Sequence, residues 1–191
     1  NRAITILSGH KAYTAISHGN EVFFLSSDGG ISSKKEGRNA QFITRLDSSK
    51  RHETVSGTFR IGNDWYIFTT EGSYILHLNS HTVSLNLDLN IKRGEVDTDN
   101  KGNFWVHNST GAMWYVNAKS RKIKTFRLIP EDKVSYIDRE RYYIIQDERG
   151  IIWISTYGNG LFAYDSKTEK LQHFTFSING FSISIPTTSS I

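Results

Sequence analysis

Short apolar and aromatic runs alternate with glycine-containing turns along this chain. One unit of the pattern recurs four times: a turn glycine, a strand-like run, a second glycine and another strand-like run. The first glycines are Gly19, Gly62, Gly102 and Gly150, and they recur at intervals of 43, 40 and 48 residues. A period of about 40–50 residues built from short strands and glycine turns predicts the blades of a β-propeller.

Each copy predicts four antiparallel strands. The first glycine lies in the turn between the first two strands, as in Asp99-Asn100-Lys101-Gly102, because Asn and Gly accept the positive φ of tight turns. Runs such as Trp153-Ile154 are apolar without clean alternation, which is typical of strands covered on both faces. The sequence therefore predicts an all-β fold of four four-stranded antiparallel blades, at residues 12–46, 54–89, 95–128 and 134–176.

The two ends of the chain predict parts of further blades. Residues 1–7 are expected to form the fourth strand of a preceding blade, and residues 182–191 the first strand of a following one. The chain is then a partial propeller, either a fragment or one half of an association between two chains. Exposed blade edges and faces favour such contacts, so neighbouring blades or a second copy in a homodimer are expected partners.

Tryptophan recurs in the second strand of three copies. Trp65, Trp105 and Trp153 each follow the first glycine by three residues, which predicts equivalent positions and packing between blades. Aromatic side chains also line ligand pockets, where they can stack on sugar rings. Trp114 falls outside the repeat and is therefore the more interesting candidate for a ligand contact.

The fourth copy resembles the two-component-regulator propeller repeat. The residues that carry the resemblance are Asp147-x-x-Gly150-x-Ile152-Trp153-Ile154-x-Thr156, Gly158-x-Gly160-Leu161-x-x-Tyr164-Asp165 and Phe174. The third copy matches the first half of this pattern over residues 99–106 and departs from it afterwards. The first and second copies share only the glycine spacing and the hydrophobicity.

That repeat is known from the periplasmic sensor regions of hybrid two-component histidine kinases. The resemblance implies a periplasmic segment of a membrane-anchored parent protein that detects oligosaccharides and signals across the inner membrane to regulate transcription. The segment itself would then not be an enzyme. A protein-interaction propeller without a small-molecule ligand is the alternative, and a polysaccharide hydrolase or lyase ranks last.

The sequence shows no signature of a metal, cofactor or catalytic site. It has no Cys, which excludes disulfides and thiolate ligands. His77 and His81 are four residues apart, but they lie in a strand-and-turn segment and not on one face of a helix. Asp147 and Glu148 fall in a repeat turn, where Asp is a turn residue before it is one of the paired carboxylates of a glycosidase. No cofactor is predicted.

Charge adds little to this picture. The chain has 23 Lys and Arg against 19 Asp and Glu, and the basic residues are scattered. Scattered charge indicates a solvated surface, so no nucleic-acid partner is expected. No run of 18 apolar residues occurs, so no membrane span is predicted within these residues.

Functional residues of propellers usually lie in loops at one face of a rigid scaffold. The turns between the second and third strands of each blade share such a face with the connections between blades. The candidate ligand-binding residues on or near this face are His107, Asn108, Trp114, Arg139, Arg141, Tyr157 and Asn159. Their hydrogen-bonding, cationic and aromatic groups suit a polar or anionic glycan, and they would equally suit an ordinary hydrated surface.

Overall fold

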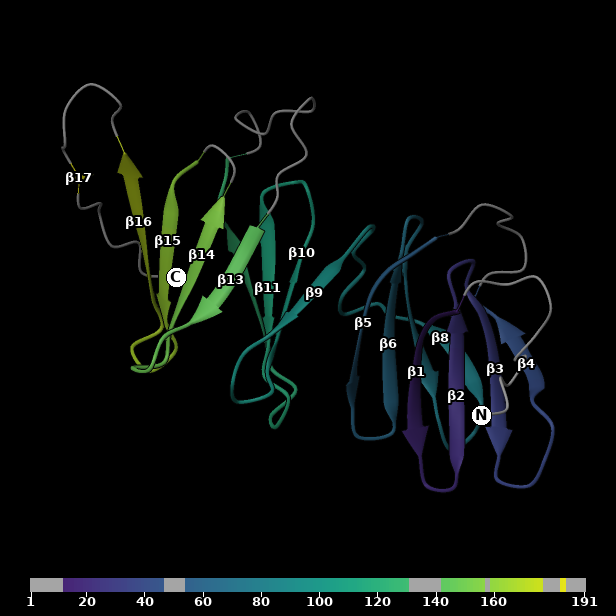
Figure 1. The fold of residues 1–191 in the computed structure, drawn as a ribbon. Helices are drawn as coiled ribbons and strands as arrows, with labels where there is room; N and C mark the ends of the chain where they lie inside the picture. The colour runs from purple at the N-terminus through teal and green to yellow at the C-terminus, as the bar shows by residue number, and fades with distance from the viewer. Residues whose placement is uncertain (1–11, 47–53, 131–141, 157–158, 177–182, 185–191) are drawn as a thin grey trace. The chain divides into compact units, whose positions relative to one another are not determined.

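The computed structural model describes residues 12–46, 54–130, 142–156, 159–176 and 183–184, and every regular element among them is a strand. Four antiparallel sheets follow one another along the chain, and within each sheet every strand pairs with its neighbour in sequence (Figure 1). This arrangement confirms the prediction of an all-β partial propeller with four four-stranded blades.

The chain divides into two compact units, residues 1–95 and 96–191. The first blade consists of β1 (Ala12–His18), β2 (Glu21–Ser26), β3 (Gly30–Lys35) and β4 (Gln41–Arg45). The second consists of β5 (Val55–Ile61), β6 (Asp64–Thr69), β7 (Ser73–His77) and β8 (Thr82–Leu85). The third consists of β9 (Glu95–Thr98), β10 (Phe104–His107), β11 (Ala112–Val116) and β12 (Ile123–Arg127). The fourth consists of β13 (Tyr142–Gln146), β14 (Ile151–Thr156), β15 (Leu161–Asp165) and β16 (Lys170–Phe176).

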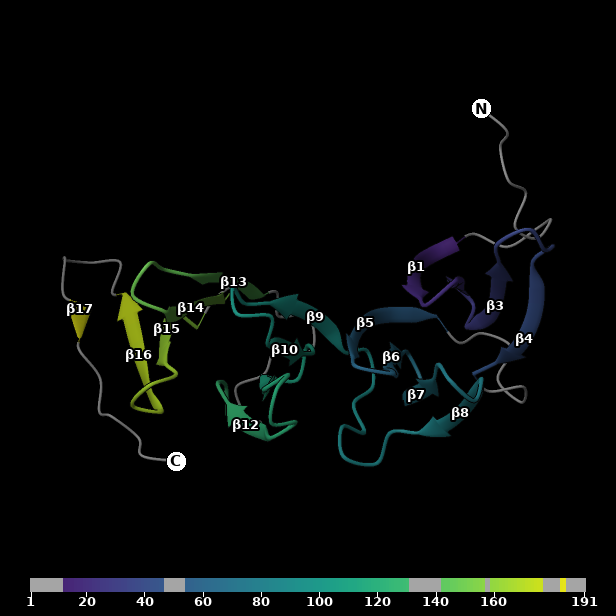
Figure 2. The same ribbon diagram turned by 90° about the horizontal axis from the view of Figure 1, so that it is seen from below.

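In the first unit, the core lies between the first and second blades. Phe23 and Leu25 of the first blade and Trp65 and Ile67 of the second are all fully buried in one apolar cluster. Figure 2 shows the two sheets of this unit side by side. Burial of such side chains contributes about 1.5–3 kcal/mol each, which is why a single blade is not stable without a neighbour.

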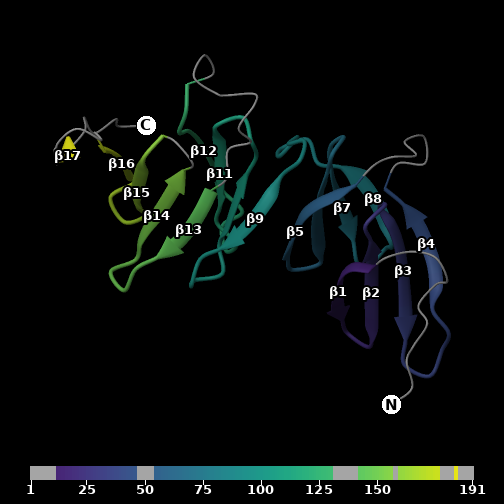
Figure 3. The same cartoon turned by 45° about the horizontal axis from the view of Figure 1, so that its top comes forward.

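In the second unit, an aromatic cluster joins the third and fourth blades. The ring of Trp105 lies 4.8 Å from that of Tyr115, 5.8 Å from that of Phe126 and 5.5 Å from that of Tyr164, measured between ring centroids. Ile152 of β14 closes the layer from the fourth blade, whose strands β13 to β16 follow in order in Figure 3. Offset and edge-on ring pairs of this kind stabilise a core beyond their buried area.

The strand register corrects the expectation that three tryptophans are equivalent. In the second blade Gly62 and Asn63 form a two-residue turn, and Asp64 already pairs with His77 at the end of β7. In the third blade the turn is longer, so Trp105 lies one strand position further on and pairs with Tyr115. Trp65 therefore faces the preceding blade, whereas Trp105 faces the following one.

The longer turns of the third and fourth blades are held by an aspartate. Asp99 Oδ1 accepts hydrogen bonds from the backbone N–H of Lys101 (2.9 Å) and Asn103 (2.8 Å). Asp147 Oδ1 accepts the matching bonds from Arg149 (3.0 Å) and Ile151 (2.9 Å). The prediction that Asp147 is a turn residue is confirmed.

Asp147 also has an altered acidity. Loss of solvation would raise the pKa of its carboxyl, but the hydrogen bonds from Ile151, Trp153 and Arg149 outweigh it and lower the pKa to about 2. The carboxyl of an aspartate in the unfolded chain has a pKa of about 3.9. As the pH falls, the unfolded chain is therefore protonated at Asp147 before the folded chain is. The stabilisation by Asp147 is therefore complete above about pH 4 and is lost as the pH falls towards 2.

We expect Asp147→Asn to flatten the dependence of stability on pH in this window. The measurement is the urea midpoint of the second unit between neutral pH and about pH 2.5. Asn keeps an acceptor for the turn N–H groups and removes the titrating group. Glu148→Gln is the control, since the Glu148 side chain has no hydrogen-bond partner in the described part of the chain. The prediction would be contradicted if the urea midpoint fell equally steeply with pH in Asp147→Asn and in the unaltered chain.

The predicted end strands lie almost wholly outside the described residues. Residues 1–7 lie outside the described residues. Within 182–191 the structure describes β17 (Ile183–Ser184), which pairs antiparallel with Thr175 and Phe176 of β16. The assignment of this range to a following blade stays a prediction. In the described segments, no helix has the length and apolar character needed to cross a membrane.

Candidate functional site

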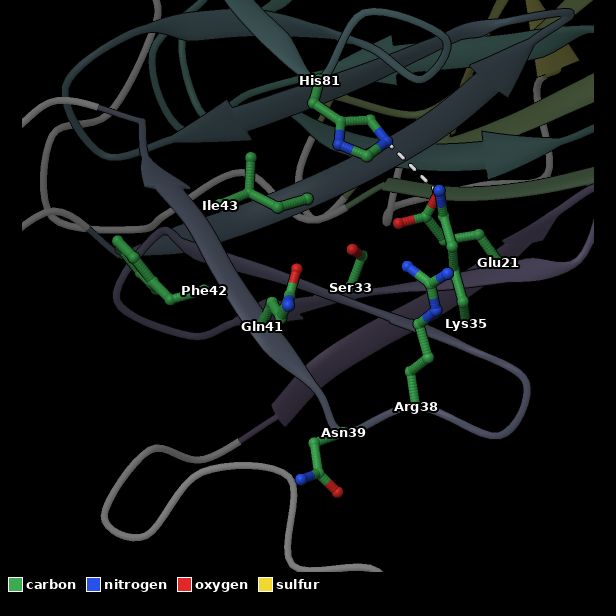
Figure 4. A pocket seen from close by; sticks show the side chains of 9 residues that line it. All are labelled: Glu21, Ser33, Lys35, Arg38, Asn39, Gln41, Phe42, Ile43 and His81. Carbon is green, nitrogen blue, oxygen red and sulfur yellow. Dashed lines mark ion pairs between the residues drawn. The ribbon is translucent and has the colours of Figure 1, made fainter.

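A pocket of about 230 Å³ lies in the first unit, between the first blade and the turn that joins β7 to β8 (Figure 4). Its lining is mostly polar and comes from β2, β3, β4 and the turns next to them. The lining residues are Glu21, Ser33, Lys35, Arg38, Asn39, Gln41, Phe42, Ile43 and His81.

A β-bulge in β4 shapes one wall of this pocket. The pairing of β3 with β4 shifts between Ile31–Thr44 and Ser32–Phe42, which leaves Ile43 as an extra residue. Successive side chains of a regular strand point to opposite faces, and a bulge re-aims one of them. Phe42 and Ile43 therefore both line the pocket, and the Phe42 side chain remains 58% exposed.

The inner end of the pocket carries a buried ionic cluster. Glu21 is only 8% exposed, and its Oε2 lies 3.2 Å from His81 Nε2 and 3.8 Å from Lys35 Nζ (Figure 4). Burial would raise the pKa of Glu21, but the hydrogen bond from Ser33 and the charges of His81 and Lys35 outweigh it and lower the pKa. Glu21 is thus a carboxylate that ties the second blade to the first.

The other groups of the pocket suit binding better than catalysis. The Arg38 guanidinium has no side-chain partner among the described residues, so it is available to a ligand. Gln41 and Asn39 add amide donors and acceptors beside the exposed Phe42 ring. Glu21 is the one carboxylate among the nine lining residues, whereas glycoside hydrolysis needs two that flank the bond.

Two of the candidate residues from the sequence have structural contacts. His107 is 3% exposed, its Nε2 lies 2.9 Å from Asp97 Oδ2, and its ring packs edge-on against Tyr142 at 5.1 Å. Asn108 Oδ1 accepts hydrogen bonds from the backbone N–H (3.1 Å) and the hydroxyl (2.6 Å) of Thr110. His107 thus packs between blades, and Asn108 stabilises the β10–β11 turn.

The remaining candidates are spread over the second unit. Trp114 is half-buried in the middle of β11, opposite Val106 and Thr125. The backbone oxygen of Asn159 lies 2.6 Å from His173 Nε2. Arg139, Arg141 and Tyr157 lie outside the described residues. A ligand site formed by these seven residues stays a prediction.

The pocket lies at the end of its blades opposite to the one that the sequence favoured. His107 ends β10, and Asn108 and Asn159 lie in turns between second and third strands, whereas the pocket is built around the β3–β4 and β7–β8 turns. Phe42 was not among the candidate residues predicted from the sequence. No pattern of apolar residues shows a bulge, so only the pairing register reveals this wall.

In the described segments, no group of three or more His, Asp or Glu side chains is close enough together to hold a metal ion. His77 Nδ1 lies 2.9 Å from Asp64 Oδ1, and His81 is paired with Glu21. The two histidines therefore have separate acidic partners, on different blades.

Comparison with solved structures finds the same architecture in several proteins. The extracellular domain of BT4673 from B. thetaiotaomicron, assigned to a hybrid two-component system, matches 92% of this chain with a TM-score of 0.57 and 14% identity, and 23% of its own chain is covered. The extracellular domain of BT3049 from the same organism, also assigned to such a system, matches 91% of this chain with a TM-score of 0.56 and 16% identity, and 24% of its own chain is covered. Virginiamycin B lyase from Staphylococcus aureus matches 93% of this chain with a TM-score of 0.55 and 13% identity, and 62% of its own chain is covered.

The chain thus spans a quarter or less of the two extracellular domains and under two-thirds of the lyase. At these identities the likeness establishes the fold. The presence of two extracellular domains of hybrid two-component systems agrees with the resemblance carried by the fourth blade. No protein-family model matches the sequence, and the search of curated proteins gives no match.

Proposed function

We propose that this chain is part of the periplasmic sensor propeller of a hybrid two-component histidine kinase, and that it binds oligosaccharides. Binding would be signalled across the inner membrane to regulate transcription. The observation that carries the proposal is the agreement between the repeat motif of the fourth blade and the structural likeness to two extracellular domains of such systems. Since one fold hosts many functions, the binding site must support the proposal independently.

The pocket of the first unit offers the groups that a sugar needs. The Phe42 ring gives an apolar face for the C–H surface of a pyranose, while Arg38, Asn39 and Gln41 offer hydrogen bonds to ring hydroxyls. The Glu21–His81 pair holds the two walls together, so the site is formed before the ligand arrives. These features support a non-catalytic saccharide site.

We expect Phe42→Ala to weaken binding of a responsive oligosaccharide by about tenfold or more, because a stacked ring contributes about 0.5–1.5 kcal/mol beyond its buried area. Isothermal titration of the purified chain against a panel of neutral and acidic oligosaccharides measures this. Tyr143→Ala is the control, since Tyr143 is 69% exposed and lies in the other unit. Equal affinities for both variants would contradict the placement of the site.

The signalling part of the proposal is tested on the whole parent protein. In membranes, the responsive oligosaccharide should change the rate of autophosphorylation, and Phe42→Ala should shift the response to higher concentrations. A parent gene that encodes no membrane helix and no kinase would overturn the proposal. Stable capture of a protein, without any response to saccharides, would favour the interaction-propeller alternative, and turnover of a polysaccharide would favour the hydrolase or lyase.

A further inference from the structure

A second pocket, of about 380 Å³, lies in the second unit between the third and fourth blades. It is lined from the turns that precede β10 and follow β11 and β15, so it lies at the end of its blades where the first pocket lies in the first unit. Its volume falls in the range of about 300–1,000 Å³ that small-molecule sites occupy.

Positive charge dominates this pocket. Four lysines line it, Lys101, Lys122, Lys124 and Lys167, against a single glutamate, Glu169. Lys124 and Glu169 form an ion pair with each other across the two blades. In the described part of the chain, Lys101 and Lys122 have no ion-pair partner, and Lys167 has no contact ion pair but lies near the Asp165 carboxylate, whose pKa it lowers. A concave site with unpaired like charges attracts an anion more strongly than scattered surface lysines do.

A tyrosine hydroxyl adds a directional donor. Tyr164 is 1% exposed and lines the pocket, yet its hydroxyl has no hydrogen-bond partner among the described residues. Burial, with smaller contributions from Glu169 and Asp165, raises the pKa of this hydroxyl to about 12, so it keeps its proton. This hydroxyl is not among the buried polar atoms that lack a partner, so it is accessible from the pocket and can donate to a ligand oxygen.

The walls that carry the lysines are held rigidly. Asn103 is 7% exposed; its Nδ2 donates to Asp99 Oδ2 (2.9 Å), and its Oδ1 accepts from the backbone N–H of Ala118 (3.1 Å). These bonds connect the turn of Lys101 to the turn of Lys122. Asn117 Oδ1 accepts from the backbone N–H groups of Lys119 and Ser120, which fixes the second turn. A fixed wall lowers the entropy that ligand binding has to offset.

We infer that this lysine pocket binds the carboxylate or sulfate group of an acidic saccharide unit. The charged group would lie among Lys101, Lys122 and Lys167, and the Tyr164 hydroxyl would donate to a ligand oxygen. The saccharide class rests on the proposed function, while the requirement for an anion follows from the lysines themselves. Amide and hydroxyl side chains complete the lining and suit the ring hydroxyls.

Titration calorimetry of the full chain tests this inference with three probes: trigalacturonate, a sulfated galactose disaccharide and neutral galactotriose. We expect one or both acidic probes to bind at least tenfold more tightly than the neutral one, with affinity falling as salt rises. The Lys101→Gln, Lys122→Gln double variant should lose about tenfold or more in affinity for the acidic probe. Tyr164→Phe should lose about fivefold, as expected for one hydrogen bond.

Lys119→Gln is the matched control, because Lys119 belongs to the same β11–β12 turn but does not line the pocket. Equal binding of acidic and neutral probes, or full affinity in the double variant, would overturn the inference. In that case the proposed function would still stand if Phe42→Ala alone abolished saccharide binding. Inorganic sulfate that binds as tightly as the sulfated disaccharide would overturn the saccharide assignment. Lysine-dependent binding of an acidic probe without any kinase response would support this site and overturn the proposed function.

Discussion

Replacing Trp105 with alanine is expected to lower the free energy of unfolding of the second unit by about 3–5 kcal/mol. Trp105 is fully buried, and its ring touches those of Tyr115, Phe126 and Tyr164, so the change removes the centre of the layer between two blades. The buried Nε1 has no hydrogen-bond partner in the described residues, so the loss is one of packing alone. The rigid sheets on either side limit how far the cavity can collapse.

The measurement is chemical denaturation followed by circular dichroism, with hydrogen exchange to assign the loss to residues 96–191. Trp153→Ala is the control, because Trp153 occupies the corresponding position of the fourth blade but is only half-buried. Trp153→Ala should lower the free energy of unfolding by clearly less, about 1–2 kcal/mol. Equal losses for the two variants would show that burial between these blades does not set the stability of the unit.

Local sequence signals predicted part of this fold, and the tryptophans show where such signals fail. Glycine spacing predicted four blades, and the Asp-x-x-Gly turns predicted the role of Asp147, because both depend on local backbone chemistry. The glycine spacing failed for Trp65. The second blade has a turn of two residues and the third blade a longer one, so residues three positions after the first glycine lie on opposite faces of the strand in the two blades. The pairing register, which is not local, decides which layer a side chain enters.

The candidate pockets depend even more on such non-local features. His81 and Glu169 hold the same position in the β7–β8 and β15–β16 turns, and both have positive φ values, 58° and 59°. A left-handed conformation costs a residue other than glycine about 1–2 kcal/mol. Each of the two side chains reaches the preceding blade of its own unit, His81 to Glu21 and Glu169 to Lys124. These ion pairs offset part of the cost and place a charged residue at each pocket.

Gly160→Ala is the second change with a large expected effect, a loss of about 2–5 kcal/mol in the stability of the second unit. Gly160 has a φ of 88°, and a methyl group on its Cα would lie 2.3 Å from the backbone oxygen of Phe174. The left-handed conformation alone costs alanine about 1–2 kcal/mol, and a clash in a packed site adds about 1–3 kcal/mol. Phe174 cannot move away freely, because it pairs with Leu161 in the β15–β16 ladder.

Gly150→Ala separates the two contributions. Gly150 has nearly the same φ, 86°, but its methyl group would meet only the ends of the Gln146 and Lys101 side chains, at 3.7 and 3.9 Å. This variant should therefore lose only the conformational part, about 1–2 kcal/mol. Urea unfolding of both variants measures the difference, which reports the clash with β16. If both variants lost the same amount, the close approach of β15 to β16 at Gly160 would not contribute to stability, and the turn conformation would account for the whole effect.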